Sequence, residues 1–282
     1  MGDGSRYRVG VIGDPVEHSI SPAMQQPALD ALGIPATYER WHTTLAELPA
    51  RIESLREPDV LGANVTVPHK EHVIPLIDEV SALAARAGAV NTISNRNGRL
   101  FGDNTDVYGL ARALQLHAGD LAGCQAVILG AGGAARAAVL SLESVGAGRI
   151  SILNRTVERA ERLRVDLSPA PVDALASEAP AALEAIRSAD LLINATALGW
   201  KRGELPLSEE RIALLPATAL VVDITYRDTD LLEAARARRL RALDGLEMLV
   251  FQGARSLEIW TGKSAPVDLM LDAARVARAA RS

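Results

Sequence analysis

Several kinds of residue are scarce in this 282-residue chain, and each shortage excludes a class of protein. The single cysteine, Cys124, cannot form a disulfide within the chain, which fits a reducing compartment. No apolar run approaches the roughly 18 residues of a membrane span, and the first residues lack the apolar segment of a secretory signal. The net charge is −5 with both signs mixed along the chain, which gives nucleic acid no basic surface. We therefore expect a cytoplasmic globular protein, long enough for two domains, without a nucleic-acid or membrane partner.

Metal-binding patterns are also missing. The five histidines and the one cysteine show no recognisable zinc spacing, and a pair three residues apart, His69 and His72, is more often a surface feature than a ligand pair. The sequence therefore predicts no metal centre.

Lysine is the scarcest of the basic residues, with three lysines among 30 lysines and arginines. One of them, Lys70, follows a stretch, residues 60–67, in which Asn64 and Thr66 alternate with apolar residues, as in a strand with one polar face. Pro68 should end this strand and begin a helix over residues 69–79, which places Lys70 near a helix N-terminus, where a cation is disfavoured. Lysine can exchange its proton whereas arginine cannot, so Lys70 is a candidate for proton transfer. On this stretch alone, a solvated surface lysine is the simpler interpretation.

The first hundred residues alternate between strand and helix patterns, which is typical of an α/β domain. We expect strands at 7–12, 37–42, 60–67, 90–93 and 99–102, and helices at 22–32, 45–55, 69–79 and 79–86. Asn97-Gly98 predicts a tight hairpin between the last two strands. Ser21 is placed to cap the first helix, whereas Ser19 has no such structural role, and both hydroxyls can face the same way.

A second conspicuous polar stretch, residues 102–106, precedes a helix expected over residues 107–117. Asp106 stands at the N-terminus of that helix, where a carboxylate is stabilised by the helix dipole. Capping of the helix is therefore an alternative to a chemical role for Asp106. We place a domain boundary here.

The middle of the chain carries a dinucleotide-binding motif. An apolar strand, residues 125–129, leads into Gly130-Ala131-Gly132-Gly133-Ala134-Ala135 and then a helix, which is the G-x-G-x-x-A arrangement of a Rossmann fold. Gly130 permits the tight turn, and Gly132 lets the backbone approach a pyrophosphate at the helix N-terminus. Further strands at 149–153, 191–193 and 220–224 indicate a parallel sheet, and Thr196 and Tyr226 follow the carboxyl ends of two of them.

The residues after the second Rossmann strand indicate which dinucleotide binds. An NAD site would carry an acidic residue there, but the sequence is Asn154-Arg155-Thr156, with Arg159 one helical turn beyond Arg155. Two guanidinium groups on one helix face suit the 2′-phosphate of NADP. A solvated basic helix start is the weaker interpretation, because arginine opposes the helix dipole there.

Seven motifs follow one another along the chain. They are Ser19-Ile20-Ser21-Pro22, Asn64-Val65-Thr66-Val67-Pro68-His69-Lys70, Gly88-Ala89-Val90-Asn91-Thr92, Gly102-Asp103-Asn104-Thr105-Asp106, Gly130-Ala131-Gly132-Gly133-Ala134-Ala135, Asn154-Arg155-Thr156 and Gly245-Leu246-Glu247-Met248-Leu249-Val250 followed after one residue by Gln252. In this order, over residues 8–270, they resemble shikimate dehydrogenase. The resemblance implies an oxidoreductase that reversibly reduces 3-dehydroshikimate to shikimate with NADPH, in aromatic amino acid biosynthesis. It also implies two α/β domains with a cleft between them: a substrate-binding catalytic domain of residues 1–105 plus 244–282, and a Rossmann NADP-binding domain of residues 106–243.

The resemblance also implies residue roles. Lys70 and Asp106 resemble the catalytic pair. Ser19, Ser21 and Tyr226 resemble the groups that hold the substrate carboxylate, and Asn64, Thr66, Asn91 and Gln252 resemble those that bind its hydroxyls. The cofactor-binding set is Gly130, Ala131, Gly132, Gly133, Ala134, Asn154, Arg155, Thr156, Arg159 and Thr196.

The chemistry expected of such residues agrees with this implied reaction. Hydride transfer to a ketone develops negative charge on oxygen, which a nearby acid must neutralise with a proton. An ammonium group can supply it and a carboxylate can position that ammonium, although the sequence does not assign the proton to Lys70 or to Asp106. Hydrogen-bonding side chains also suit a small polyhydroxylated carboxylate, because they reject analogues that lack the hydroxyls.

Three alternatives remain at this stage. A quinate/shikimate dehydrogenase that prefers NAD tends to have threonine in place of Ser21 and an acidic residue in place of Arg155. An aminoshikimate dehydrogenase is harder to separate by motif. A non-catalytic nucleotide sensor on this fold is disfavoured because both Lys70 and Asp106 are present.

The sequence departs from the family pattern at one position: Trp200 stands where the family more often has methionine or another aliphatic residue. His69 occupies a position that varies in the family, so we assign it no role. We expect the chain to be a monomer or a homodimer.

Overall fold

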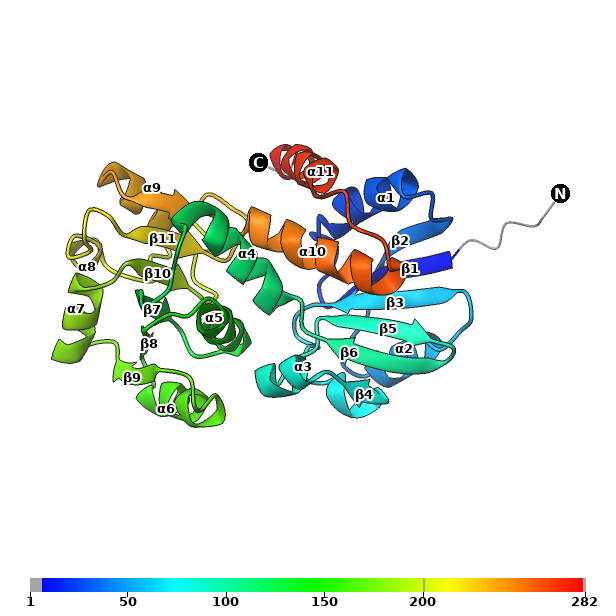
Figure 1. The fold of residues 1–282 in the computed structure, drawn as a ribbon, viewed down its shortest axis with the longest axis horizontal. Coiled ribbons are helices and arrows are strands. Elements are labelled where there is room, and N and C mark those ends of the chain that lie inside the picture. The colour runs from blue at the N-terminus through cyan, green and yellow to red at the C-terminus, as the bar shows by residue number, and fades with distance from the viewer. Residues whose placement is uncertain (1–6, 200, 281–282) are drawn as a thin grey trace. The chain divides into compact units, whose positions relative to one another are not determined.

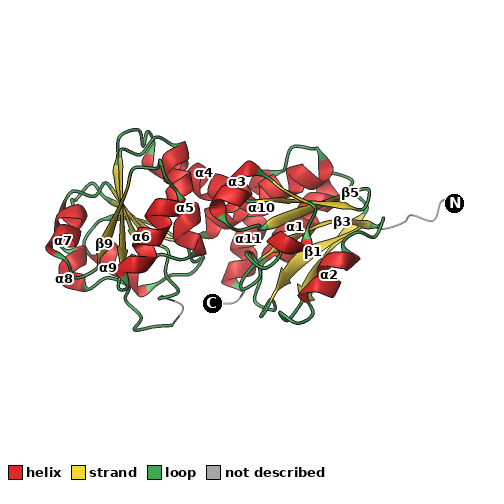
Figure 2. Ribbon diagram, turned by 90° about the horizontal axis from the view of Figure 1, so that it is seen from below, coloured by secondary structure: helices red, strands yellow, loops and turns green. Residues whose placement is uncertain are grey.

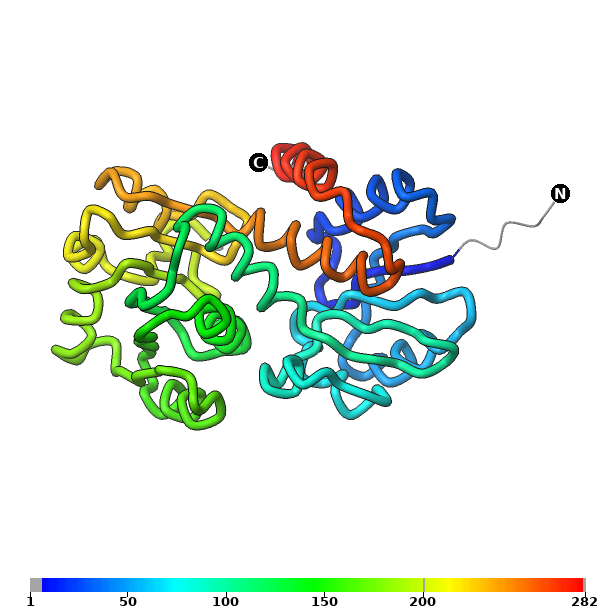
Figure 3. Tube along the Cα trace, in the orientation of Figure 1, coloured from blue at the N-terminus to red at the C-terminus, as the bar shows by residue number. Residues whose placement is uncertain are grey.

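The computed structural model describes residues 7–199 and 201–280. The chain forms two compact units, one of residues 1–109 and 250–282 and the other of residues 110–249. The path of the chain through each unit can be followed in Figure 1 and, as a simple trace, in Figure 3. The sequence predicted domain boundaries after residues 105 and 243, a few residues before the unit boundaries after residues 109 and 249.

The first unit contains a mixed six-stranded sheet in the order β2-β1-β3-β5-β6-β4. Its strands are β1 (Tyr7–Gly13), β2 (Ala36–His42), β3 (Val60–Val65), β4 (Glu79–Val80), β5 (Thr92–Arg96) and β6 (Arg99–Asp103). Strands β1, β2 and β3 are parallel, whereas β5 and β6 form an antiparallel hairpin. Its turn residues Asn97 and Gly98 have φ values of 56° and 85°, which confirms the predicted tight turn.

Helices cover this sheet. They are α1 (Ser21–Ala31), α2 (Leu48–Ser54), the 3₁₀ helix η1 (Ile74–Leu76), α3 (Ala82–Ala87) and α11 (Val267–Ala279), and the ends of α4 (Asp106–Ala118) and α10 (Leu246–Thr261) complete the unit. The alternation predicted along β3 is present, since Ala63 and Val65 join an apolar core with residues of α2 and α3. Asn64 points to the other face, where it meets Tyr38 of β2 and Ser256 of α10. Val67, the last apolar residue of the stretch predicted as a strand, is 64% exposed, because β3 ends before it.

The helix predicted over residues 69–79 does not form. Hydrogen-bonded turns over residues 66–73 and the short η1 occupy this segment. Pro75 would lie inside the predicted helix, where it has no N–H to donate and its ring would clash with the carbonyl group of Glu71. Lys70 therefore lies in a turn, after a cis bond between Val67 and Pro68, and not at a helix N-terminus.

Two predicted helix starts in this unit are also wrong. Ser21 does not cap α1, because α1 already begins at Ser21 and Ile20 is its N-cap residue. The Ser21 N–H instead donates to Oγ of Ser19 at 3.2 Å. The helix expected from residue 79 begins at Ala82, because Ser81 caps it with a hydroxyl that accepts from the Ala84 N–H.

The second unit is a doubly wound fold. Its six strands are all parallel, in the order β12-β11-β10-β7-β8-β9, which is the arrangement of a dinucleotide-binding domain. The strands are β7 (Gln125–Leu129), β8 (Arg149–Asn154), β9 (Val172–Ala176), β10 (Leu191–Asn194), β11 (Leu220–Asp223) and β12 (Arg241–Leu243), and the helices are α5 (Gly133–Ser144), α6 (Val157–Asp166), α7 (Pro180–Arg187), α8 (Glu209–Ile212) and α9 (Asp230–Ala237). Figure 2 views this sheet nearly edge-on, with α7 and α8 on one face and α5 and α6 on the other.

Candidate active site

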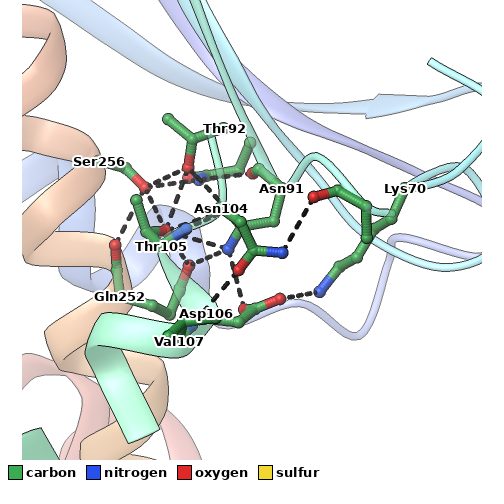
Figure 4. A network of polar contacts seen from close by, with 11 residues as sticks. Lys70, Asn91, Thr92, Asn104, Thr105, Asp106, Val107, Gln252 and Ser256 are labelled. Carbon is green, nitrogen blue, oxygen red and sulfur yellow. Dashed lines mark hydrogen bonds and ion pairs between the residues drawn. The ribbon is translucent and has the colours of Figure 1, made fainter. Parts of the chain in front are cut away.

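Lys70 and Asp106 form an ion pair in the first unit. Nζ of Lys70 lies 2.6 Å from Oδ2 of Asp106, and the two side chains are 28% and 14% exposed (Figure 4). The turn after β3 presents Lys70, whose carbonyl oxygen accepts from the Val90 N–H at 2.8 Å, so the backbone at the lysine is held against the segment before β5. Lys70 is thus a half-buried, paired cation and not a solvated surface lysine.

Asp106 is not the cap of its helix. Oδ1 of Asn104 accepts from the Val107 N–H at 3.3 Å, which is a capping contact at the start of α4. Both oxygens of Asp106 accept from side chains instead: Oδ2 accepts from Lys70 and Oδ1 accepts from Nδ2 of Asn91 at 2.8 Å. The carboxylate is therefore oriented by two donors and lies at the favourable end of the α4 dipole.

Asn91 connects this pair to the interior. Its side chain is 2% exposed, and its Oδ1 accepts from the Thr105 N–H at 2.7 Å. Its Nδ2 donates to Asp106 and also lies 3.3 Å from Oε1 of Gln252 (Figure 4). A backbone donor on one side and a carboxylate on the other fix which way the amide faces.

Asn64 lies deeper in the same polar network. Its Oδ1 accepts from the Tyr38 hydroxyl at 2.8 Å, and its Nδ2 donates to Oγ of Ser256 at 2.9 Å and to the Asn91 carbonyl oxygen at 3.2 Å. Burial raises the pKa of Tyr38 far above its usual value, and this outweighs the lowering by a hydrogen bond with Ser21 and by the charge of Arg40. Tyr38 is therefore a neutral phenol that joins Ser21 to Asn64.

Four members of the network were not predicted from the sequence: Tyr38, Thr92, Thr105 and Ser256. The hydroxyls of Thr92, Thr105 and Ser256 lie within 3.2 Å of one another, and Ser256 stands one helical turn after Gln252 on α10. Two signals in the sequence could have located them: the spacing of four residues on one helix, and the alternation of Tyr38 along its strand.

The two serines are held in different ways. Oγ of Ser19 accepts from the Ser21 N–H, and the Arg40 guanidinium donates twice to the Ser19 carbonyl oxygen, at 2.8 and 3.2 Å. The Ser19 hydroxyl thus keeps its own proton for a ligand. Thr66 is half-buried, its N–H donates to the Ile12 carbonyl oxygen, and its hydroxyl has no partner among residues 7–199 and 201–280.

The predicted dinucleotide motif has the backbone that it requires. Gly130 has a φ of 101°, and a Cβ there would lie 2.9 Å from Cγ2 of Thr196, so a larger residue would be strained and crowded. A Cβ on Gly132, the N-cap residue of α5, would meet nothing within 4 Å. The space above Gly132 is therefore open beside the first N–H groups of a twelve-residue helix, which fits a pyrophosphate.

Two arginines flank the end of β8. Arg155 and Arg159 are exposed, and neither guanidinium forms an ion pair with any described residue. Nδ2 of Asn154 donates to the Thr156 carbonyl oxygen at 2.7 Å, which tightens the turn into α6. Free cations at this position fit a 2′-phosphate.

The remaining predicted residues lie at the carboxyl ends of β10 and β11. Thr196 is half-buried, and its hydroxyl donates to Oδ1 of Asn194 at 2.7 Å. Tyr226 is half-buried in the loop after β11. Trp200 lies outside the described residues. In the described part of the chain, no helix is long and apolar enough to cross a membrane, and no three His, Cys, Asp or Glu side chains gather as metal ligands.

Models of known families match almost the whole chain. The shikimate dehydrogenase substrate binding domain matches residues 11–93, shikimate / quinate 5-dehydrogenase matches residues 112–247, and the shikimate 5′-dehydrogenase C-terminal domain matches residues 245–275. Among curated proteins, the shikimate dehydrogenase (NADP(+)) of Symbiobacterium thermophilum is 43% identical over 275 residues, which cover 95% of this chain and 94% of that protein.

Solved structures agree with these matches. The shikimate dehydrogenase of Aquifex aeolicus superposes with a TM-score of 0.89 at 34% identity, covering 98% of this chain and all of that one. The shikimate 5-dehydrogenase of Thermus thermophilus, in complex with NADP(H) and shikimate, superposes with a TM-score of 0.86 at 39% identity, covering 96% and 99%. The chain therefore belongs to the shikimate dehydrogenase family.

Proposed function

We propose that the protein is an NADP-dependent shikimate dehydrogenase, an oxidoreductase that reversibly reduces 3-dehydroshikimate to shikimate in aromatic amino acid biosynthesis. The observation that carries this proposal is the Lys70–Asp106 pair, with its 2.6 Å contact and with Asn91 on the other carboxylate oxygen. A polar network of amides and hydroxyls extends from that pair, as a polyhydroxylated substrate requires. Bound NADPH supplies the hydride.

Lys70 is the proton donor in this proposal. Both oxygens of Asp106 accept hydrogen bonds from N–H groups, which suits an ionised carboxylate beside a charged ammonium. During reduction, the carbonyl oxygen of the substrate gains negative charge as its carbon receives the hydride, and Nζ of Lys70 transfers a proton to that oxygen. Asp106 orients the ammonium, and Asn91 orients Asp106. In the reverse direction, Lys70 takes the proton back from the hydroxyl.

We infer two binding roles from hydroxyls that the structure leaves available to a ligand, those of Ser19 and Thr66, and we carry the other roles over from the family resemblance. Ser19 is a donor for the substrate carboxylate, a role that the resemblance also gives to Ser21 and Tyr226. Thr66 binds a ring hydroxyl, as the resemblance implies for Asn64 and Gln252. The donors of Asn91 are already engaged within the protein, so we assign Asn91 primarily to Asp106.

We infer that residues 1–109 and 250–282 bind the substrate and carry the catalytic pair, and that residues 110–249 bind NADP. In the second unit, Gly130, Ala131, Gly132, Gly133 and Ala134 hold the pyrophosphate, and Asn154, Arg155, Thr156, Arg159 and Thr196 surround the rest of the cofactor. Cys124 is buried, and burial raises the pKa of its thiol, so it suits the reducing cytoplasm where we place this enzyme.

Replacement of Lys70 tests this function. In Lys70→Ala, we expect kcat for shikimate oxidation to fall by roughly 100- to 10,000-fold, because a positioned general acid–base contributes about that much. The dissociation constant of shikimate, measured by calorimetry, should change far less. The matched control is Lys263→Ala, which removes an exposed lysine bound to the Leu32 carbonyl oxygen and should turn over normally. Wild-type turnover by Lys70→Ala would remove Lys70 from the mechanism.

Substrate identity needs its own experiment. We expect the highest kcat/KM with shikimate and NADP in a panel of shikimate, quinate and aminoshikimate, each with NADP and with NAD. A preference for quinate with NAD, or for aminoshikimate, would replace the proposal by one of those alternatives. Absence of turnover with all six pairs would favour a non-catalytic nucleotide-binding protein.

A further inference from the structure

Asp223 is a fully buried carboxylate in the second unit, at the end of β11. Its exposed fraction is 0%, and no lysine, arginine or histidine of the described chain forms an ion pair with it. A charge without a counter-ion is costly to bury, so its environment must solvate it by other means. Neither the family motifs nor the proposed proton transfer uses this residue.

Four hydrogen-bond donors replace water around the carboxylate. Oδ1 accepts from the Thr225 N–H at 3.0 Å and from the Thr225 hydroxyl at 2.9 Å. Oδ2 accepts from Nδ2 of Asn194 at 2.9 Å and from the Thr229 hydroxyl at 3.0 Å. Each oxygen therefore faces one hydroxyl, which can rotate, and one N–H group, which cannot.

This arrangement requires two accepting oxygens. The Thr225 donor is backbone, and Asn194 cannot turn its amide over, because its Oδ1 accepts from the Thr196 N–H at 3.1 Å and its Nδ2 also donates to the Leu198 carbonyl oxygen at 3.0 Å. An asparagine at position 223 would place an N–H against one of these two donors. Only a carboxylate can accept from both the Thr225 N–H and Nδ2 of Asn194.

The two sides of Asp223 hold two different loops. Through Asn194 it holds Thr196 and Leu198, and the Leu198 N–H in turn donates to the Thr196 hydroxyl at 3.1 Å. Gly199 completes this loop with a φ of 108°, and a Cβ there would lie 3.5 Å from Oδ2 of Asp223. Through Thr225 the same carboxylate holds the residue directly before Tyr226.

We propose that Asp223 is a positioning residue that couples the loop of the cofactor contact Thr196 to the loop of the substrate contact Tyr226. This inference rests on the proposed function, which assigns those two contacts. The Thr196 loop also lies against the dinucleotide motif, because Cγ2 of Thr196 is the nearest atom to a Cβ built on Gly130. Disturbing Asp223 should therefore weaken the binding of both ligands and leave proton transfer by Lys70 unchanged.

Asp223→Asn is the main test. We expect the dissociation constant of NADP⁺, measured by calorimetry without substrate, to rise about tenfold, and the KM of shikimate at saturating NADP⁺ to rise by a similar factor. The pH profile of kcat should keep the wild-type midpoint, because Lys70 and Asp106 are untouched. A matched control is Val221→Ala, in the same strand, which opens a cavity in the hydrophobic core without changing either loop. It should leave the dissociation constant of NADP⁺ and the KM of shikimate unchanged.

A second variant decides the matter if Asp223→Asn does not fold. Thr225→Val removes one hydroxyl donor from Oδ1 and keeps the Thr225 N–H, so the unit should fold, with a two- to fivefold rise in both constants. Wild-type constants in a folded Asp223→Asn, or in Thr225→Val when the former is unfolded, would overturn the inference. Equal changes in Val221→Ala would also overturn it, since they would show an effect of stability alone. Failure of the wild-type protein to oxidise shikimate would count against the proposed function instead, and NADP⁺ binding would still report on the cofactor loop.

Discussion

Removal of one buried hydroxyl, in Tyr38→Phe, should destabilise the first unit in a way that depends on pH. Tyr38 is 5% exposed, and its hydroxyl is the donor to Oδ1 of Asn64. Phenylalanine fills the same space but leaves that oxygen without its donor, and an unsatisfied buried acceptor costs about 1–3 kcal/mol. Near pH 8 we therefore expect the free energy of unfolding to fall by about 1–2 kcal/mol, toward the lower part of that range because phenylalanine is cheaper to bury than tyrosine.

Alkaline pH should remove this difference. Burial raises the pKa of Tyr38 in the folded protein, whereas the unfolded chain titrates near 10. Above that pH the folded state keeps a proton that the unfolded state has lost, so the stability contributed by Tyr38 is complete below pH 10 and declines as the pH rises. The slope is about 1.4 kcal/mol per pH unit, and at pH 11 the wild-type protein has lost about 1.4 kcal/mol that Tyr38→Phe has not. The two proteins should then be nearly equally stable.

Tryptophan fluorescence can follow this unit alone. Trp41 and Trp260 both belong to it, and replacing Trp200 by phenylalanine in every protein removes the third tryptophan. Urea unfolding at pH 8 and pH 11 would then give the two differences in free energy. Tyr7→Phe is the matched control, since Tyr7 is 38% exposed and its loss should cost little at either pH. A penalty for Tyr38→Phe that is equal at both pH values would refute the reasoning.

Two further predictions concern the second unit. Arg155→Ala should reduce the preference for NADP over NAD by about ten- to a hundredfold in kcat/KM, because a charged hydrogen bond is worth roughly 1.5–3 kcal/mol. The control is Arg164→Ala, at the other end of α6, which should leave the preference unchanged. Equal losses for both cofactors in Arg155→Ala would contradict the 2′-phosphate assignment. Gly130→Ala should raise the dissociation constant of NADP⁺, measured by calorimetry, by about tenfold or more. The φ of 101° strains any residue that has a Cβ, and that Cβ would lie 2.9 Å from Cγ2 of Thr196. Binding as tight as in the wild type would show that the turn can relax at no cost.

Local patterns in the sequence were sufficient for much of the fold. Four of the six parallel strands of the second unit, β7, β8, β10 and β11, were visible because each is a short apolar run followed by turn residues. Several elements were missed, among them β4, β9, α7, α8 and β12. The strands among them have weak signals: β9 is only partly buried along most of its length, β4 has two residues and β12 has three. The predicted helix over residues 69–79 failed because Pro75 was given too little weight against the apolar spacing.

The contacts within the site were less predictable than the residue types. The family resemblance implied Lys70 and Asp106 as a pair, but the contact between them depends on a turn that was predicted as a helix. The helical spacing of Ser256 from Gln252 and the alternation of Tyr38 along its strand are local signals, but their proximity to Asn64 and Thr92 arises from tertiary packing, which no local pattern shows. Asp223 could not be predicted as a functional residue for the same reason. An aspartate at the end of a strand is common, and only the structure shows the four hydrogen-bond donors around this one.

The network around Asn64 also sets an order for folding. Asn64 and Ser256 are hydrogen-bonded although 192 residues separate them, and Thr92 and Ser256 are 164 residues apart. The intervening unit of residues 110–249 is contiguous and can close its own core as soon as it leaves the ribosome. The first unit must wait for α10, because until then Asn64 and Thr92 lack the hydroxyl of Ser256. The polar network beside Lys70 can thus be completed only after α10 has been synthesised, by which point every residue of the dinucleotide-binding unit is already part of the chain.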